Sequence, residues 1–95
     1  METYVVLGRL TEKATANLKD PALIEDSFKA SEEVGGELKG FYVTMGRYDF
    51  VAIWEFPDDD AMMKATLRVG ATGAVRTETL KAISWDKVKK MIQKI

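Results

Sequence analysis

Two polar residues stand where a tight turn leads into an apolar strand. Tyr48 and Asp49 follow Gly46 and Arg47 and precede the run Phe-Val-Ala-Ile-Trp-Glu-Phe. A carboxylate entering a buried strand is costly unless it is paired or hydrogen-bonded. The phenol and the carboxylate could therefore orient a small ligand. Alternatively, Asp49 accepts backbone N–H groups in the turn while Tyr48 packs at an interface, which is the usual behaviour of these residue types.

A second polar pair lies near the C-terminus on another predicted strand. Arg76 and Glu78 are two residues apart, so their side chains share one face of that strand. A guanidinium beside a carboxylate can bind a carboxylate ligand, and can act as an acid and base pair when water is excluded. The same two residues can equally form cross-strand or intersubunit ion pairs.

The other residues with functional side chains are expected to serve in packing and helix capping. We expect Trp54 to pack in the core or at an interface; alternatively, its ring forms a wall on which a ligand stacks. Asp58 to Asp60 are expected to cap a helix, because consecutive acids point in different directions and cannot surround a hard cation. The chain has no His and no Cys, which removes the usual imidazole and thiolate ligands. We expect no metal and no cofactor.

The elements that must position these residues alternate between strands and helices. Asp20 and Pro21 are typical of a helix start, and Gly35 is typical of a helix end. Four strands are predicted: 3–10, 37–44, a third that follows a turn at Gly46 and ends at Phe56, and 74–83. Four helices are predicted: 13–18, which Thr11 caps; 21–34; a third that begins at the aspartates, runs to Val69 and is closed by Gly70; and 84–95.

This order is βαββαβ with an added helix over residues 84–95, in one domain of 95 residues. It predicts an α+β, ferredoxin-like antiparallel sheet with helices on one face. The first and third strands have the most apolar faces, so we expect them to be the inner pair. On the third strand one face carries Tyr48, Phe50, Ala52, Trp54 and Phe56, and the other carries Asp49, Val51, Ile53 and Glu55.

A strand that is apolar on both faces needs both faces covered. The chain has enough helix to cover one side of a small sheet, so we expect a second copy to cover the other side. The last helix has an apolar stripe of its own, Val88, Met91, Ile92 and Ile95, and we expect it to lie on the domain's own sheet edge or on a neighbour.

Three segments together resemble the GYD domain family. They are Lys39-Gly40-Phe41-Tyr42 before the turn, Gly46-Arg47-Tyr48-Asp49 at the hairpin, and Val75-Arg76-Thr77-Glu78-Thr79-Leu80 on the last strand. The resemblance covers residues 1–83 and leaves the final helix outside. This family is similar to the dimeric α+β barrel superfamily, in which ferredoxin-like domains pair through their sheets. The resemblance implies a fold and a dimer, and it implies no activity.

Charge and hydropathy exclude several partners. The chain has 14 basic and 15 acidic residues and a net charge of −1, so we expect no nucleic acid partner. The lysines near the C-terminus (Lys81, Lys87, Lys89, Lys90, Lys94) are expected on the solvated side of the last helix. No apolar run is long enough to span a bilayer, and we expect a cytoplasmic protein without membrane contact.

Three functional hypotheses follow. The first is a homodimer that binds a small molecule, either between its sheet and helices or within the paired sheets, with Tyr48, Asp49, Arg76 and Glu78 as polar contacts and Trp54 as an apolar wall. The second is a cofactor-independent enzyme of the dimeric α+β barrel type, in which Asp49 or Glu78 is the base and Arg76 steadies the resulting anion. The third is a structural or regulatory subunit without a pocket.

Overall fold

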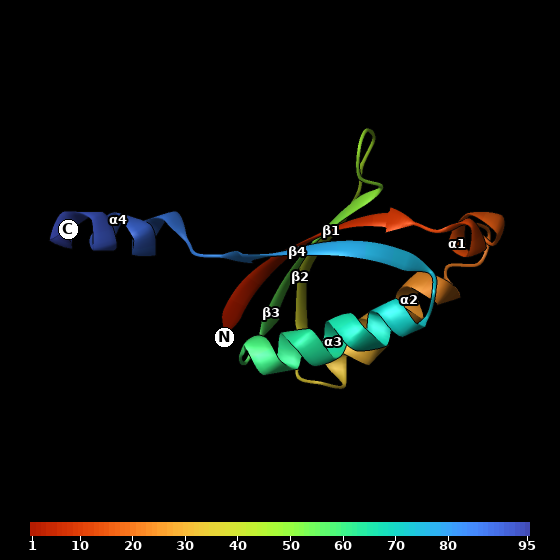
Figure 1. Ribbon diagram of the computed structural model, residues 1–95, viewed down its shortest axis with the longest axis horizontal. Coiled ribbons are helices and arrows are strands. Elements are labelled where there is room, and N and C mark those ends of the chain that lie inside the picture. Colours follow the sequence, from red (N-terminus) through yellow and green to blue (C-terminus); the bar gives the residue numbers. More distant parts are fainter.

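Two helices pack on one face of a four-stranded antiparallel sheet, and the opposite face has no helix over it (Figure 1). The computed structural model describes residues 1–95. The strand order β2-β3-β1-β4 places β1 and β3 inside, which confirms the predicted α+β ferredoxin-like arrangement. The elements are β1 Glu2–Leu10, α1 Glu12–Ala16, α2 Ala22–Glu32, β2 Glu37–Val43, β3 Phe50–Phe56, α3 Asp59–Ala71, β4 Val75–Ala82 and α4 Trp85–Lys94.

The core lies between the sheet and helices α2 and α3. Alternate side chains of β3 are buried there, and the ring centroids of Trp54 and Phe56 are 5.7 Å apart. Phe28 of α2 makes edge contacts with Phe41 and Trp54. Gly8 on β1 lies opposite Phe50, and a Cβ at this position would come within 1.9 Å of the phenyl ring. The glycine on β1 is therefore required by close packing.

The sheet face that points away from the helices is also apolar. In the register of β1, Val5 pairs with Ile53 on β3 and with Leu80 on β4, and Leu7 pairs with Val51. None of these five side chains is buried, because the helices cover only the other side. We call this surface, centred on Val5, Leu7, Val51, Ile53 and Leu80, the open face. A single copy of the chain leaves it in contact with water.

A β-bulge changes the faces of β2. The register between β2 and β3 shifts between Leu38 and Gly40. As a result Leu38 and Phe41 both pack against the core, while Tyr42 pairs with Val51 of the open face. Strict alternation along β2 would place Leu38 with Tyr42 and Phe41 on the opposite face. The observed faces differ because the extra residue of a bulge shifts the alternation by one position.

Two helix boundaries differ from the prediction. Helix α3 continues through Gly70 to Ala71, and the chain reverses at Gly73, which has a φ of 72°. Gly70 therefore does not end the helix. Thr11 precedes α1 but does not cap it with its side chain, since its hydroxyl donates to the carbonyl oxygen of Gly73 at 2.6 Å. This hydrogen bond joins the start of α1 to the start of β4.

Candidate functional site

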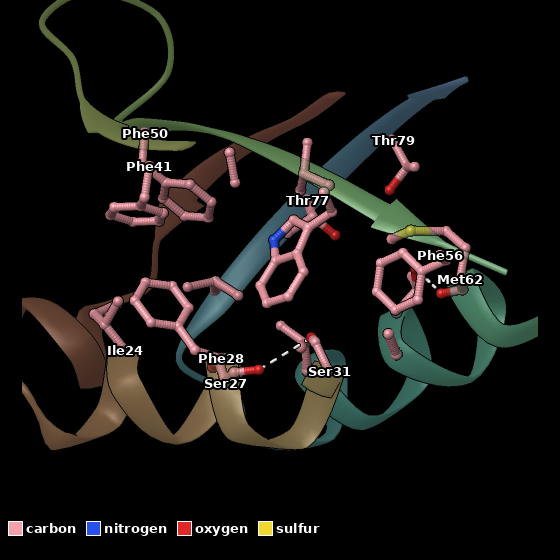
Figure 2. Close-up of a pocket in the computed structure, with 17 residues that line it drawn as sticks. Ile24, Ser27, Phe28, Ser31, Phe41, Phe50, Phe56, Met62, Thr77 and Thr79 are labelled. Atoms are coloured by element: carbon pink, nitrogen blue, oxygen red, sulfur yellow. Dashed lines mark hydrogen bonds between the residues drawn. The ribbon is translucent and has the colours of Figure 1, made fainter. Parts of the chain in front are cut away.

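A cavity of about 50 Å³ lies between the sheet and the two helices. Figure 2 shows its walls, with Phe41 and Phe50 facing Ile24 and Phe28 of α2 at one end and Phe56 beside Met62 of α3 at the other. Seventeen residues line the cavity, and twelve of them are hydrophobic, Trp54 among them. None of the seventeen is ionisable under ordinary conditions. The cavity is thus an apolar site with a small number of hydroxyl groups.

Those hydroxyls belong to five residues on three elements. Ser27 and Ser31 on α2 are buried and donate to the carbonyl oxygens of Leu23 and Ser27. Thr66 on α3 donates to the carbonyl of Met62 at 2.9 Å. Thr77 and Thr79 on β4 are exposed and line the same cavity, so they lie where it meets solvent.

The predicted residues Tyr48 and Glu78 are in contact. The Tyr48 hydroxyl donates to Glu78 Oε2 at 2.6 Å, and this hydrogen bond raises the pKa of Tyr48 above its ordinary value of 10.0. The Arg9 guanidinium lies 5.5 Å from the centroid of the Tyr48 ring. Because Glu78 pairs with Leu7 in the sheet, the contact lies on the open face. Tyr48 therefore does not share a face with Phe50 as predicted, since the turn before β3 breaks the alternation.

Arg76 also points to the open face. It pairs across the sheet with Arg9, which places two guanidinium groups on directly opposite residues. The Arg9 side chain donates to the carbonyl oxygen of Arg47 at 3.1 Å. No carboxylate lies within ion-pair distance of Arg9, Arg47 or Arg76. The three guanidinium groups therefore form no ion pair within the protomer.

Asp49 adds two hydrogen bonds between the start of β3 and the neighbouring strand β1. Its Oδ2 accepts the N–H of Leu10 at 2.8 Å, and its own N–H donates to the carbonyl of Gly8 at 2.8 Å. The carboxylate thus satisfies a backbone group of the neighbouring strand β1 and not one within the turn. Its half-buried position is stabilised by this hydrogen bond.

The five predicted ligand-binding residues do not form one cluster. Trp54 lines the cavity on the helix side of the sheet, whereas Tyr48, Arg76 and Glu78 lie on the open face. Asp49 sits at the end of the β1 and β3 ladder. A ligand in the cavity can contact Trp54, and a ligand between paired sheets can contact the other residues.

A polar cluster that the sequence did not reveal joins three elements. The Tyr4 hydroxyl on β1 and the Lys81 ammonium on β4 both donate to Asp59 Oδ1 at the start of α3, the latter at 2.8 Å. Asp58 is the residue that caps α3, accepting the N–H of Ala61 at 2.9 Å. The predicted capping role therefore holds for Asp58, while Asp59 ties the helix to the sheet. No local pattern brings residues 4, 59 and 81 together.

The contacts within this cluster shift three pKa values. Hydrogen bonds from Lys81 and then from Tyr4 lower the pKa of Asp59 below its ordinary value of 3.8. The hydrogen bond to Asp59 raises the pKa of Lys81. Burial, followed by the contact with Asp59, raises the pKa of Tyr4 well above 10.0. The fold thus favours a neutral Tyr4, an ionised Asp59 and a protonated Lys81, which are the states that prevail at neutral pH.

The acidic residues do not converge elsewhere. No group of three or more Asp or Glu side chains is placed so that it could hold a metal ion.

None of the helices combines the length and the apolar character that crossing a bilayer requires.

The fold and the site define a ferredoxin-like α+β domain with one uncovered apolar sheet face and an uncharged internal cavity. The model of the GYD domain family matches residues 4–92. The chain belongs to the GYD domain family. The match continues past residue 83, where the sequence resemblance was expected to end, and includes most of α4.

Three known proteins are similar to this chain. The glutamine synthetase and cystathionine beta-lyase binding protein of Thermus thermophilus is 34% identical in an alignment of 85 residues that covers 87% of this chain and 90% of that protein. A crystal structure of a protein from Thermus thermophilus superposes with a TM-score of 0.59 at 24% identity, covering 88% of this chain and 95% of that one. The feast or famine regulatory protein of M. tuberculosis, complexed with L-methionine, gives 0.58 at 18% identity, covering 88% of this chain and 51% of that one. The two structures establish similarity of fold.

The Tyr4, Asp59 and Lys81 cluster predicts a pH-dependent contribution to stability. Because the folded pKa of Asp59 lies below 3.8, its contribution is fully present above that pH and is lost as the pH falls through the folded pKa. Asp59→Asn should lower the Tm at pH 7, and the difference from the wild type should shrink below about pH 4. Thermal unfolding followed by circular dichroism from pH 2 to pH 8 measures this.

Asp60→Asn is the matched control, because Asp60 is in the same turn and pairs only with Lys64 on the helix surface. It should change the Tm little at any pH. A difference between Asp59→Asn and the wild type that stays constant down to pH 2 would contradict the role given to the Asp59 charge.

Proposed function

We propose that this chain is a homodimer that binds a small, uncharged molecule in the cavity between its sheet and its helices. The observation that carries the proposal is the chemistry of the cavity, which is walled by apolar side chains including Trp54 and carries only hydroxyl groups as polar atoms apart from the indole N–H. An ionised ligand would lose its hydration there without gaining a partner of opposite charge. A neutral ligand avoids that cost.

The size of the cavity limits the ligand further. A volume of about 50 Å³ is well below the roughly 300 Å³ at which sites for larger ligands begin. The ligand class that fits is therefore a short aliphatic molecule with one neutral hydrogen-bonding group. Thr77 and Thr79, at the solvent side of the cavity, are the hydroxyls available to that group.

The open face supports the dimer. Its five aliphatic side chains form a continuous patch over the three strands β3, β1 and β4. Contiguous apolar surface of this kind on a soluble protein marks an interaction site. Pairing with the same face of a second copy covers both patches at once, as a two-fold axis requires.

Charges at the two ends of the open face support one orientation of the pair. Arg9 and Arg76 lie at the end where β1 finishes, while Glu37 and Glu55 lie at the other end with Lys39 between them. A two-fold axis between the sheets and perpendicular to the strands brings the arginine end of one protomer to the carboxylate end of its partner. The approach of opposite charges offsets the repulsion between Arg9 and Arg76.

In this pair Tyr48, Asp49, Arg76 and Glu78 become residues of the interface between sheets. Arg76 and Glu78 then contact the partner, or they contact a ligand enclosed between the sheets. The enzyme alternative has less support. Neither Asp49 nor Glu78 lines the cavity, and each carboxylate already accepts a hydrogen bond.

A protein-binding subunit is the second candidate function. The observation that favours it is the relative of 34% identity, which is named for binding to glutamine synthetase and cystathionine beta-lyase. Identity at that level across most of both chains makes a shared mode of action a reasonable inference. In this alternative the domain is an adaptor that attaches to a larger enzyme.

The dimer is tested with Ile53→Glu, which places a charge at the centre of the open face. Sedimentation velocity should show a dimer for the wild type and a monomer for the variant, because two buried carboxylates would face each other across the axis. Leu67→Glu is the control, since Leu67 is 65% exposed on α3 and away from the open face; it should stay dimeric. A monomeric wild type would contradict the proposal.

Arg76→Glu should also weaken the dimer, and adding Glu55→Arg should restore it.

Ligand binding is tested by fluorescence in a Trp85→Phe background, where Trp54 is the only tryptophan. Titration with ethanol should change the emission of Trp54 and raise the Tm, whereas acetate, of similar size but charged, should do neither. Thr77→Val should weaken the effect of ethanol, and Thr3→Val on the other face should not. Equal responses to ethanol and acetate would exclude a cavity selective for neutral molecules.

The adaptor function is tested with purified glutamine synthetase and cystathionine beta-lyase from the organism that produces this chain. Biolayer interferometry with the immobilised chain should detect saturable binding to at least one of them, and none to an unrelated enzyme of similar size and charge. Absence of binding to both enzymes at micromolar concentration would remove this candidate.

A further inference from the structure

Helix α4 presents an apolar stripe that its own domain does not cover. No residue of α4 is buried; Trp85 is 66% exposed and Ile95, which follows the helix, is 98% exposed. Figure 1 shows α4 extending from the end of β4, away from the sheet and from α2 and α3. A helix of ten residues is marginal in water on its own. It therefore needs a surface that covers the stripe formed by Trp85, Val88, Met91, Ile92 and Ile95.

An apolar groove of about 280 Å³ lies at the opposite end of the molecule, between α1, α2 and the end of β2. Twelve residues line it, eight of them hydrophobic, and two of these, Leu18 and Val43, are 65% and 81% exposed. Its only charged residues are Asp20 and Glu25. We call this surface the α1–α2 groove.

The helix and the groove are complementary in polarity and in charge. The polar side of α4 carries four lysines and a single acid, Asp86. The groove offers an apolar floor with two carboxylates at its margin. An apolar stripe seated in such a groove leaves the lysines at the margin, where they meet the carboxylates. The lysines of α4 are Lys87, Lys89, Lys90 and Lys94.

The helix cannot reach the groove of its own chain. The molecule is 51 Å long, and α4 and α1 lie at its two ends (Figure 1). Only Ile83 and Ser84 connect β4 to α4, and two residues span roughly 10 Å at most when fully extended between their neighbours. Any α4 that occupies the groove must therefore come from another molecule.

We propose that α4 of one copy docks in the α1–α2 groove of a second copy, and that the second copy returns the same contact. This inference rests on the proposed homodimer. A two-fold axis perpendicular to the strands exchanges the two ends of the sheet, so the α4 end of one protomer lies over the α1 end of its partner. The groove lies on the helix side of the partner's sheet, where Ile24, Phe28 and Phe41 line it, so α4 passes the end of that sheet to reach it. The two copies make this contact reciprocally, as an isologous interface requires. In that assembly α4 is an exchanged arm.

Cysteine cross-linking of the full-length chain tests this arrangement, because the chain has no cysteine of its own. Ile92→Cys in a chain with a large tag is mixed with Leu18→Cys in an untagged chain, and the mixture is oxidised. The proposal predicts a shift of both chains to the mass of a covalent heterodimer. Leu67→Cys replaces Leu18→Cys in the control, since Leu67 is equally exposed at 65% but lies outside the groove; this mixture should stay uncoupled.

The outcomes separate this inference from the homodimer. A dimer by sedimentation without the link between positions 92 and 18 would overturn the arm exchange and leave sheet pairing intact. A monomer would overturn both. Equal coupling to positions 18 and 67, or a link within one chain between Ile92→Cys and Leu7→Cys on its own open face, would also overturn the arm exchange. Lys90→Glu should slow the predicted cross-link, and Glu25→Lys in the partner chain should restore its rate.

Discussion

The structure depends on the mismatch between a sheet that is apolar on both sides and helices that cover one side. On β1 and β3 the buried residues Tyr4, Val6, Ala52 and Trp54 alternate with the uncovered residues Val5, Leu7, Val51 and Ile53. Each aliphatic side chain moved fully out of water contributes about 1.5–3 kcal/mol. The helix side already has that contribution, and the open face gains it only through association.

The two faces of the sheet therefore differ in the chemistry they can carry. On the helix side a small cavity contains hydroxyls but no charge, and it suits a neutral molecule. The open face combines an aliphatic centre with unpaired arginines near Tyr48 and Glu78, and it suits a second protein surface. The Tyr4, Asp59 and Lys81 cluster secures α3 to both β1 and β4 at one end of the cavity. These contacts hold the first turn of α3 against the sheet.

The periodicity of the sequence predicted the fold well, because the apolar residues of β1 and β3 dominate the energetics and the glycines at 35 and 46, both with positive φ, place the turns. The faces of β2 cannot be predicted by simple alternation, because one bulge shifts the alternation after Leu38. The face of Tyr48 was missed because a turn separates it from the strand. The candidate site could be predicted only in part: Arg76 and Glu78 share a face by simple spacing, whereas Tyr4, Asp59 and Lys81 meet only through the tertiary fold. The cavity likewise has no local signal in the sequence, since side chains from four strands and two helices line it.

We propose that a second copy buries the open face, so that association contributes to the free energy of folding of this chain. The concentration dependence of thermal unfolding of the unmodified protein measures this most directly, because only a folded state that is oligomeric makes the Tm vary with concentration. We expect a Tm that rises steadily over a hundredfold increase in protein concentration, with a calorimetric transition that fits a folded dimer unfolding to two chains. A Tm that is independent of concentration, in a protein that sediments as a stable monomer throughout that range, would contradict it.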